Sequence, residues 1–145
     1  MVATVPRSPD DAVGWTVVRL AHVLSRQFEQ AMQAVALTPT QFGVLSEVAR
    51  EPGIGSGELA RRVLVTPQSV GELVASLERA GHLDRDRSGG RGRRAAITLT
   101  AQGRSVLRQA YRIVAALNEP AALGLEPEEA ATLNALLHRV LRTPR

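Results

Sequence analysis

Residues 66–100 read TPQSVGELVASLERAGHLDRDRSGGRGRRAAITLT, and this stretch decides the fold. From Val70 to Leu77 the apolar residues recur at i, i+3, i+4 and i+7, the spacing of a helix with one buried face. The Thr-Pro pair at 66–67 predicts the start of this helix, and Gly81 predicts its end. The face opposite the apolar stripe carries short polar residues in its first turn. Such residues favour a helix that reads the edges of DNA bases.

The pattern changes from helix to strand after Gly81. Apolar and polar residues alternate over 82–87 and again over 95–100, and the glycine-rich tip Ser88-Gly89-Gly90-Arg91-Gly92 lies between them. This arrangement predicts a β-hairpin.

Further helices are expected on both sides. Apolar residues at helical spacing run from Val13 to Val35, which predicts a long first helix. The second helix begins at a capping motif, residues 38–41, and is expected to turn Phe42, Leu45, Val48 and Ala49 inward. A short helix over 56–63 follows. Two helices then occupy the C-terminal part, one from about Thr100 to the residues before Pro120 and one from Glu126 onward. Thus the fold is expected to be mainly α with a small β-hairpin.

Composition narrows the possible functions. The chain has 145 residues, 44% of them apolar and none of them cysteine, so disulfides and thiol chemistry are excluded. All 18 basic residues are arginine. Eight of them, with Asp86 as the sole acid, lie between Arg85 and Arg112 and give that block +7, whereas the rest of the chain sums to −3. A basic block of this kind points to nucleic acid or to a solvated arginine-rich loop. With no membrane-length apolar run and no signal-peptide pattern, a cytoplasmic protein is expected.

A helix, a short turn, a capped helix and a basic hairpin follow one another in the order of a winged helix-turn-helix. The second helix of such a motif fits the major groove of B-DNA, and an arginine on the hairpin can enter a minor groove. Residues 37–100 are therefore interpreted as a winged helix-turn-helix DNA-binding domain, 1–9 as a flexible tail, and 10–36 and 101–142 as dimerisation helices.

The sequence resembles the MarR family of bacterial transcription regulators. The resemblance rests on residues 77–85 (LERAGHLDR), 93–103 (RRAAITLTAQG), 37–42 (LTPTQF) and Leu59-Ala60, and it covers about residues 12–142. It implies a homodimer that binds a pseudo-palindromic operator in double-stranded DNA. The apolar stripes of the terminal helices independently favour a dimer, with these interface residues: Val13, Val17, Leu20, Leu24, Ile113, Leu117, Leu133, Leu136, Leu137, Val140 and Leu141.

The resemblance also assigns roles in DNA binding. Gln68 and Ser69 would be the main base-reading residues. Beside them would lie Thr66, Pro67, Glu72 and Ser76. The arginines that mostly face phosphate would be Arg79, Arg85, Arg87 and Arg94.

One position departs from the family pattern. The wing of the family usually reads Asp-x-Arg, with the arginine entering the minor groove, whereas here the stretch is Arg91-Gly92-Arg93. Arg93 keeps the arginine position, and Arg91 either shares that role, takes it over, or is merely solvent-exposed at the hairpin tip. An added positive charge would strengthen nonspecific binding and steepen its salt dependence.

Many members of the family are released from DNA by small aromatic acids or phenols. The residues here that could line such a pocket are Trp15, His22, Arg26, Phe42, Arg108 and Tyr111, although each also has an ordinary structural explanation. The three histidines lie far apart in the sequence, so no metal site and no cofactor are expected.

The sequence therefore predicts a sequence-specific, homodimeric transcription regulator, a repressor rather than an activator, whose operator affinity an aromatic ligand lowers. An enzyme is disfavoured because no nucleophile motif, phosphate loop or nucleotide fingerprint is present. The alternative is a winged-helix module that binds DNA without sequence preference, as an architectural factor, or binds another protein.

Overall fold

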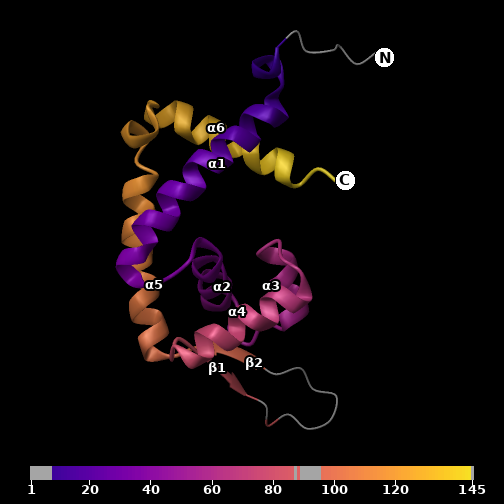
Figure 1. The fold of residues 1–145 in the computed structure, drawn as a ribbon, viewed down its shortest axis with the longest axis vertical. Helices are drawn as coiled ribbons and strands as arrows, with labels where there is room; N and C mark the ends of the chain where they lie inside the picture. Colours follow the sequence, from indigo (N-terminus) through magenta and orange to yellow (C-terminus); the bar gives the residue numbers. More distant parts are fainter. Residues whose placement is uncertain (1–7, 87, 89–95, 145) are drawn as a thin grey trace. The chain divides into compact units, whose positions relative to one another are not determined.

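The computed structural model describes residues 8–86, 88 and 96–144. Figure 1 shows a mainly helical chain with one two-stranded hairpin, which confirms the predicted fold class. The chain divides into two compact units, residues 1–110 and 111–145. In chain order the elements are η1 (Pro9–Asp11), α1 (Val13–Met32), η2 (Gln33–Val35), α2 (Pro39–Arg50), α3 (Ser56–Arg62), α4 (Pro67–Arg79), β1 (Leu83–Asp86), β2 (Ala96–Leu99), α5 (Ala101–Leu117), η3 (Pro120–Leu123) and α6 (Pro127–Leu141).

The long first helix is less regular than its apolar spacing predicted. A separate 3-10 helix with a capping box between Ser8 and Asp11 precedes it, and Ala12 is extended (φ −95°, ψ 102°) before α1 begins. At the other end the chain tightens into η2, and Ala36 takes a left-handed conformation (φ 53°). The apolar spacing runs on to Val35 through the change from α1 to η2, so it does not indicate where α1 ends.

Helix α2 begins as predicted. The Thr38 hydroxyl oxygen accepts a hydrogen bond from the Gln41 amide (3.1 Å), and the Gln41 side-chain oxygen accepts one from the Thr38 amide (2.9 Å). The residues of α2 that become fully buried are Val44, Leu45 and Val48. The prediction that Ala49 points inward was wrong, because the buried face is centred on the i, i+4 pair Val44 and Val48, which turns Ala49 to the surface.

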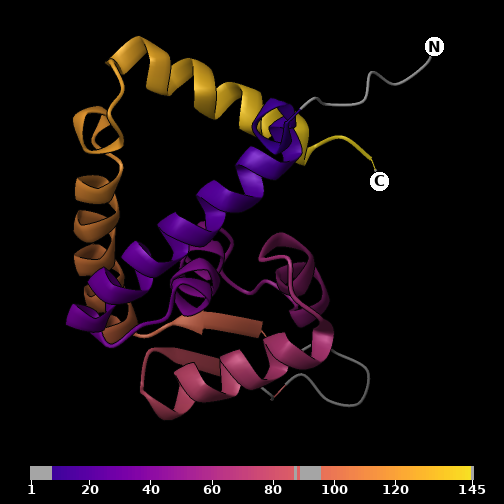
Figure 2. The same ribbon diagram turned by 45° about the horizontal axis from the view of Figure 1, so that its top comes forward.

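Helix α2 packs against both α3 and α4 and against strand β2. The two strands pair antiparallel, with Leu83 opposite Leu99 and Arg85 opposite Ile97. The Gly53 amide donates to the Ile97 carbonyl (2.8 Å), and Ile54 forms an isolated antiparallel bridge with Ile97. The segment between α2 and α3 therefore pairs with strand β2. Figure 2 shows α4 alongside this hairpin, and β1 contacts α4 directly. The core of the first unit lies where these elements meet.

The second unit contains the end of α5, η3 and α6. Gly124 ends η3 in a left-handed conformation (φ 70°), which glycine adopts without strain. A capping box between Glu126 and Glu129 then begins α6, where the sequence predicted a helix from Glu126 onward. Among the helices of the described residues, none is long and apolar enough to cross a membrane.

Candidate nucleic-acid interface

The start of α4 is fixed by its N-cap. The Thr66 hydroxyl oxygen accepts a hydrogen bond from the Ser69 amide (3.1 Å) and donates one to the Ser69 hydroxyl (2.9 Å), and Pro67 takes the first helical position. On the inner face, Val70 and Val74 are completely buried. The first turn of the opposite face, at the positive end of the helix dipole, is therefore held at the surface by the cap and the buried inner face.

The predicted base-reading residues fall into two groups. Thr66, Pro67, Gln68 and Glu72 are exposed, and Gln68 and Glu72 are separated by one helical turn. Ser69 is half-buried because its hydroxyl belongs to the cap, and Ser76 is half-buried where it accepts a hydrogen bond from the Gln41 side chain (3.4 Å). The first group therefore lies on the surface of α4, whereas Ser69 and Ser76 make hydrogen bonds within the protein.

The end of α4 is equally well defined. Gly81 has φ 77°, the Gly81 amide donates to the Glu78 carbonyl (2.9 Å), and the His82 amide donates to the Leu77 carbonyl (2.9 Å). This is the Schellman pattern of a glycine-terminated helix, as the sequence predicted. Arg79 is exposed beside this end.

The base of the hairpin holds Arg85 close to α4. The Arg85 Nε atom lies 3.7 Å from a Glu78 carboxylate oxygen, and the Arg85 side chain is only 20% exposed. The Ser88 amide donates a hydrogen bond to the Asp86 carboxylate (2.8 Å). Hydrogen bonding from the Ser88 side chain, and next from this amide, lowers the pKa of Asp86. The other wing arginines predicted to contact DNA, Arg87, Arg91, Arg93 and Arg94, lie outside the described residues.

A network that the sequence did not reveal joins α2 to α3. The Arg62 guanidinium contacts Glu58 (2.9 Å), Glu47 (3.3 Å) and Glu51. These hydrogen bonds from Arg62, above all the one to Glu58, raise the pKa of Arg62 above its usual range, and the same hydrogen bond lowers the pKa of Glu58. The i, i+4 spacing of Glu58 and Arg62 was the one signal available. Arg62 orients α3, against which α4 packs.

The junction after the hairpin is unusually close. The Thr100 hydroxyl donates to the Gly81 carbonyl (2.6 Å), and its oxygen accepts from the Gly103 amide (2.9 Å). A Cβ atom on Gly103 would stand 2.0 Å from the His82 carbonyl oxygen. The first turn of α5 and the end of α4 are thus in direct backbone contact, which fixes the hairpin relative to α4.

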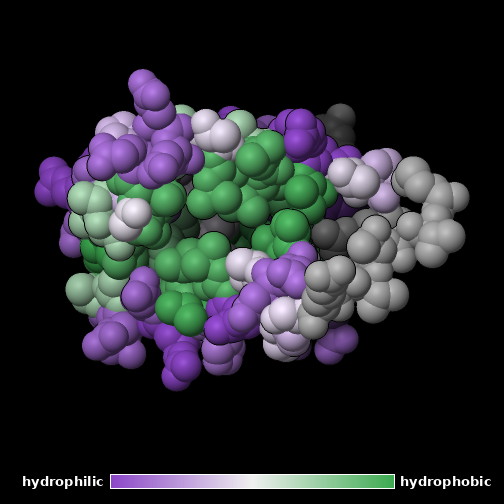
Figure 3. All heavy atoms as spheres, turned by 90° about the horizontal axis from the view of Figure 1, so that it is seen from above, coloured by the Kyte–Doolittle hydropathy of each residue, from purple (hydrophilic) through white to green (hydrophobic). Residues whose placement is uncertain are grey.

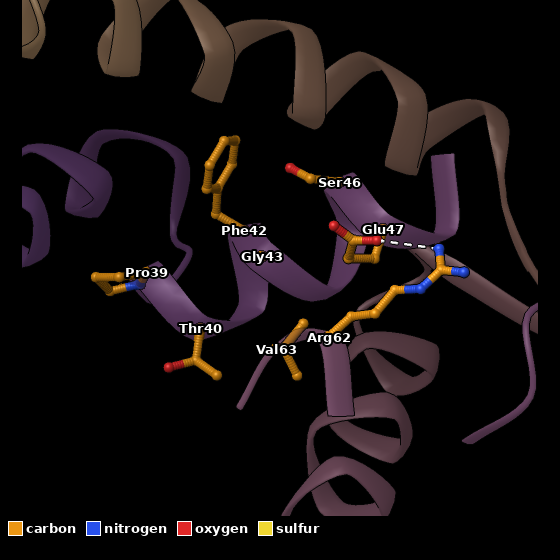
Figure 4. Close-up of a pocket in the computed structure, with 8 residues that line it drawn as sticks. All are labelled: Pro39, Thr40, Phe42, Gly43, Ser46, Glu47, Arg62 and Val63. Atoms are coloured by element: carbon orange, nitrogen blue, oxygen red, sulfur yellow. Dashed lines mark hydrogen bonds and ion pairs between the residues drawn. The ribbon is translucent and has the colours of Figure 1, made fainter. Parts of the chain in front are cut away.

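Of the six residues predicted to line a ligand pocket, Phe42 is the one that borders a hollow described here. Figure 4 shows this hollow, of about 340 Å³, on α2 and the end of α3, with Phe42 and Ser46 on one side of α2 and Glu47 and Arg62 on another. Trp15 and Tyr111 are each 49% exposed on other helices. His22, Arg26 and Arg108 are also exposed.

None of the predicted interface residues is buried within a single chain. Val13 (75%), Leu141 (65%) and Val140 (47%) are the most exposed. Trp15, Val18 and Val23 on α1 are also exposed, although they were not predicted as interface residues. Figure 3 shows hydrophobic residues, in green, exposed at the surface. The described residues contain no cluster of histidine and carboxylate side chains that could hold a metal ion.

A helix presented by a rigid helical scaffold beside a basic hairpin defines a winged helix-turn-helix DNA-binding protein. The comparisons agree. Residues 37–94 match the model of the MarR family. The HTH-type transcriptional repressor Rv2887 of Mycobacterium tuberculosis is 37% identical over 108 residues, which are 74% of this chain and 78% of that protein. The chain therefore belongs to the MarR family, which confirms a DNA-binding transcriptional repressor and excludes the enzyme alternative.

Solved structures support the same assignment over nearly the whole chain. Rv2887 in complex with salicylic acid is similar with a TM-score of 0.72 and 28% identity, covering 97% of this chain and 99% of that one. The transcriptional repressor CouR bound to a 23-mer DNA duplex is similar with a TM-score of 0.83 and 25% identity, covering 97% of this chain and 100% of that one.

Proposed function

We propose that this protein is a homodimeric repressor that acts in the cytoplasm and binds a pseudo-palindromic operator in double-stranded DNA. The observation that carries the proposal is the free face of α4, where Gln68 and Glu72 are exposed next to a capped helix N-terminus. Dimerisation through 10–36 and 101–142 would cover apolar side chains such as Val13 and Leu141. The domain 37–100 then presents one recognition helix per subunit, about 34 Å from its partner on the DNA.

Direct reading by Gln68 is the core of this proposal. A glutamine amide can donate to and accept from one adenine edge in the major groove. Ser69 contributes through its cap to the position of Gln68, and Glu72 and Arg79 extend the exposed face toward the end of α4. Arg93, with Arg91 as its alternative, would enter the minor groove, and Arg87 and Arg94 would contact phosphates.

Release by a small aromatic acid is the second part of the proposal, and Rv2887 with salicylic acid supports it. The hollow beside Phe42 is a poor receptor for a carboxylate, because its cation Arg62 is already engaged by three glutamates. An anionic ligand there would have to displace a carboxylate. Arg26 on α1 and Arg108 on α5 would instead supply the positive charge that binds the ligand carboxylate. Trp15, His22 and Tyr111 would complete the pocket.

The experiment is fluorescence anisotropy with the duplex upstream of the protein's own gene and a scrambled duplex, across a salt series. A specific regulator prefers the native duplex by about 10³-fold or more. Gln68→Ala should reduce this preference and leave binding to scrambled DNA unchanged. Gln109→Ala, at an exposed glutamine of α5, is the matched control. Equal, steeply salt-dependent binding to both duplexes would favour the architectural alternative, and no binding at low salt would favour a protein-binding module.

Ligand release is tested separately on the preformed complex. Salicylate is added to the operator complex, and the fall in anisotropy is measured for the wild type and for Arg26→Gln and Arg62→Gln. The proposal expects Arg26→Gln to require more salicylate and Arg62→Gln to respond as the wild type does. The opposite order would place the ligand in the hollow beside Phe42.

A further inference from the structure

Leu64 is an outlier in two independent respects. It is 80% exposed, and it is the one exposed large hydrophobic residue among the described residues of 37–100. It also has φ 58°, in the left-handed region, where a side chain as large as leucine is strained. The described part of the chain has one other non-glycine residue with positive φ, Ala36.

The strain follows from how α3 ends. The Val63 amide donates to the Leu59 carbonyl (3.0 Å), and the Val65 amide donates to the Ala60 carbonyl (3.1 Å). The second bond is the one that closes a Schellman motif, so Leu64 occupies the position that glycine ordinarily takes. Glycine would adopt this conformation without strain and would expose no apolar side chain. Neither the helix end nor the core therefore accounts for leucine.

The position of Leu64 indicates what could account for it. Leu64 lies two residues before Thr66, the N-cap of α4, so their Cα atoms are separated by at most about 7 Å. In the proposed function this end of α4 enters the major groove. Arg61, in the last turn of α3 before Leu64, forms an ion pair with Glu58, and its side chain is 76% exposed. An apolar group beside a cation at this end of α4 suits DNA, whose groove edges combine phosphates with thymine methyl groups and deoxyribose.

Resting on the proposed function, we propose that Leu64 is a further DNA-contacting residue, which makes an apolar contact with a thymine 5-methyl group or a deoxyribose of the operator. The contact compensates for the strained backbone only when DNA is bound. Stability of the free protein and affinity for the operator therefore make opposite demands on this residue, and that opposition is measurable.

The test compares Leu64→Gly, Leu64→Asn and Leu64→Met by thermal unfolding and by anisotropy with the native duplex. Gly and Asn both tolerate the left-handed conformation, so these variants should unfold about 2–4 °C higher than the wild type. The same two variants should bind the operator about 10-fold more weakly. Leu64→Met keeps the apolar contact and should bind as the wild type does. The salt slope should not change in any variant, because no phosphate contact is lost.

Ala36→Gly is the matched control. Ala36 ends the segment 10–36 and is not one of its predicted interface residues. The variant relieves the same backbone conformation outside the segment between α3 and α4, so it should raise the unfolding temperature and, at a concentration where both proteins are dimers, leave operator affinity unchanged. Replacing operator thymines one at a time with uracil removes single methyl groups. A uracil position that weakens the wild type but not Leu64→Gly identifies a methyl contact. Equal effects on both proteins at every position identify deoxyribose instead.

Operator affinity unchanged in Leu64→Gly, or reduced as much in Leu64→Met as in Leu64→Gly, would overturn the inference while the wild type still prefers its operator. If the wild type shows no preference for the native duplex, the proposed function fails and this inference fails with it.

Discussion

Gly103 is the position where a single added methyl group should do the most damage to the winged helix. Alanine normally stabilises a helix relative to glycine by about 1 kcal/mol, so Gly103→Ala would be beneficial if helix propensity decided the outcome. Here the new Cβ atom would stand 2.0 Å from the His82 carbonyl oxygen, and its neighbour is backbone, which cannot rotate away.

The size of the effect follows from this geometry. Relief of the overlap requires the start of α5 and the end of α4 to separate by about 1 Å, and overpacking of this kind costs about 1–3 kcal/mol. The hydrogen bond from the Thr100 amide to the His82 carbonyl (3.1 Å) would be weakened as well, at about 1 kcal/mol. After subtraction of the propensity gain, Gly103→Ala should lower the free energy of unfolding by about 2 kcal/mol.

Urea unfolding at one fixed protein concentration measures this change, since a dimer's stability depends on concentration. Gly71→Ala is the control, because Gly71 lies inside α4 and a Cβ atom there would meet nothing within 4 Å. Gly71→Ala should therefore stabilise by roughly 0.5–1 kcal/mol. The argument from backbone contact is refuted if both variants stabilise, for helix propensity would then govern Gly103 too.

Three further outcomes are expected. Thr38→Ala removes the N-cap of α2 and should cost about 1 kcal/mol in urea unfolding, whereas the exposed neighbour Thr40→Ala should change it by less than about 0.5 kcal/mol. Because Arg62 lowers the pKa of Glu58, this pair should stabilise the fold above pH 4.5 and lose that contribution as the pH falls; Glu58→Gln should flatten this acid limb of stability against pH. Arg93→Ala should reduce the salt slope of operator binding by about one contact per subunit.

The sequence predicted those features that local hydrogen bonds determine. The cap at Thr38, the cap at Thr66 and the glycine stop at Gly81 all form as expected, because each depends on residues within five positions of one another. The two strands of the hairpin also form where alternation predicted them, and Leu83 and Ile97 are buried.

Features that depend on which elements meet in space could not be predicted in the same way. Arg62 contacts Glu47 and Glu51, which are 15 and 11 residues away, and no local rule selects those partners. Burial of Val44 rather than Ala49 depends on how α3 and α4 pack on α2. Five wing arginines were assigned to DNA from sequence, and their roles stay predictions.

The basic block shows why charge counted along a sequence overstates contacts with DNA. Eight arginines lie between 85 and 112, yet Arg85 pairs with Glu78 and Arg104 donates to the Leu99 carbonyl (2.9 Å) at the base of the hairpin. The guanidinium groups of Arg85 and Arg104 thus stabilise the base of the wing through contacts within the protein. Since each phosphate contact adds about 0.9 to the salt slope, the slope per subunit should fall well short of the value that all eight arginines would give. A slope matching eight contacts would mean that DNA binding breaks both of these internal contacts.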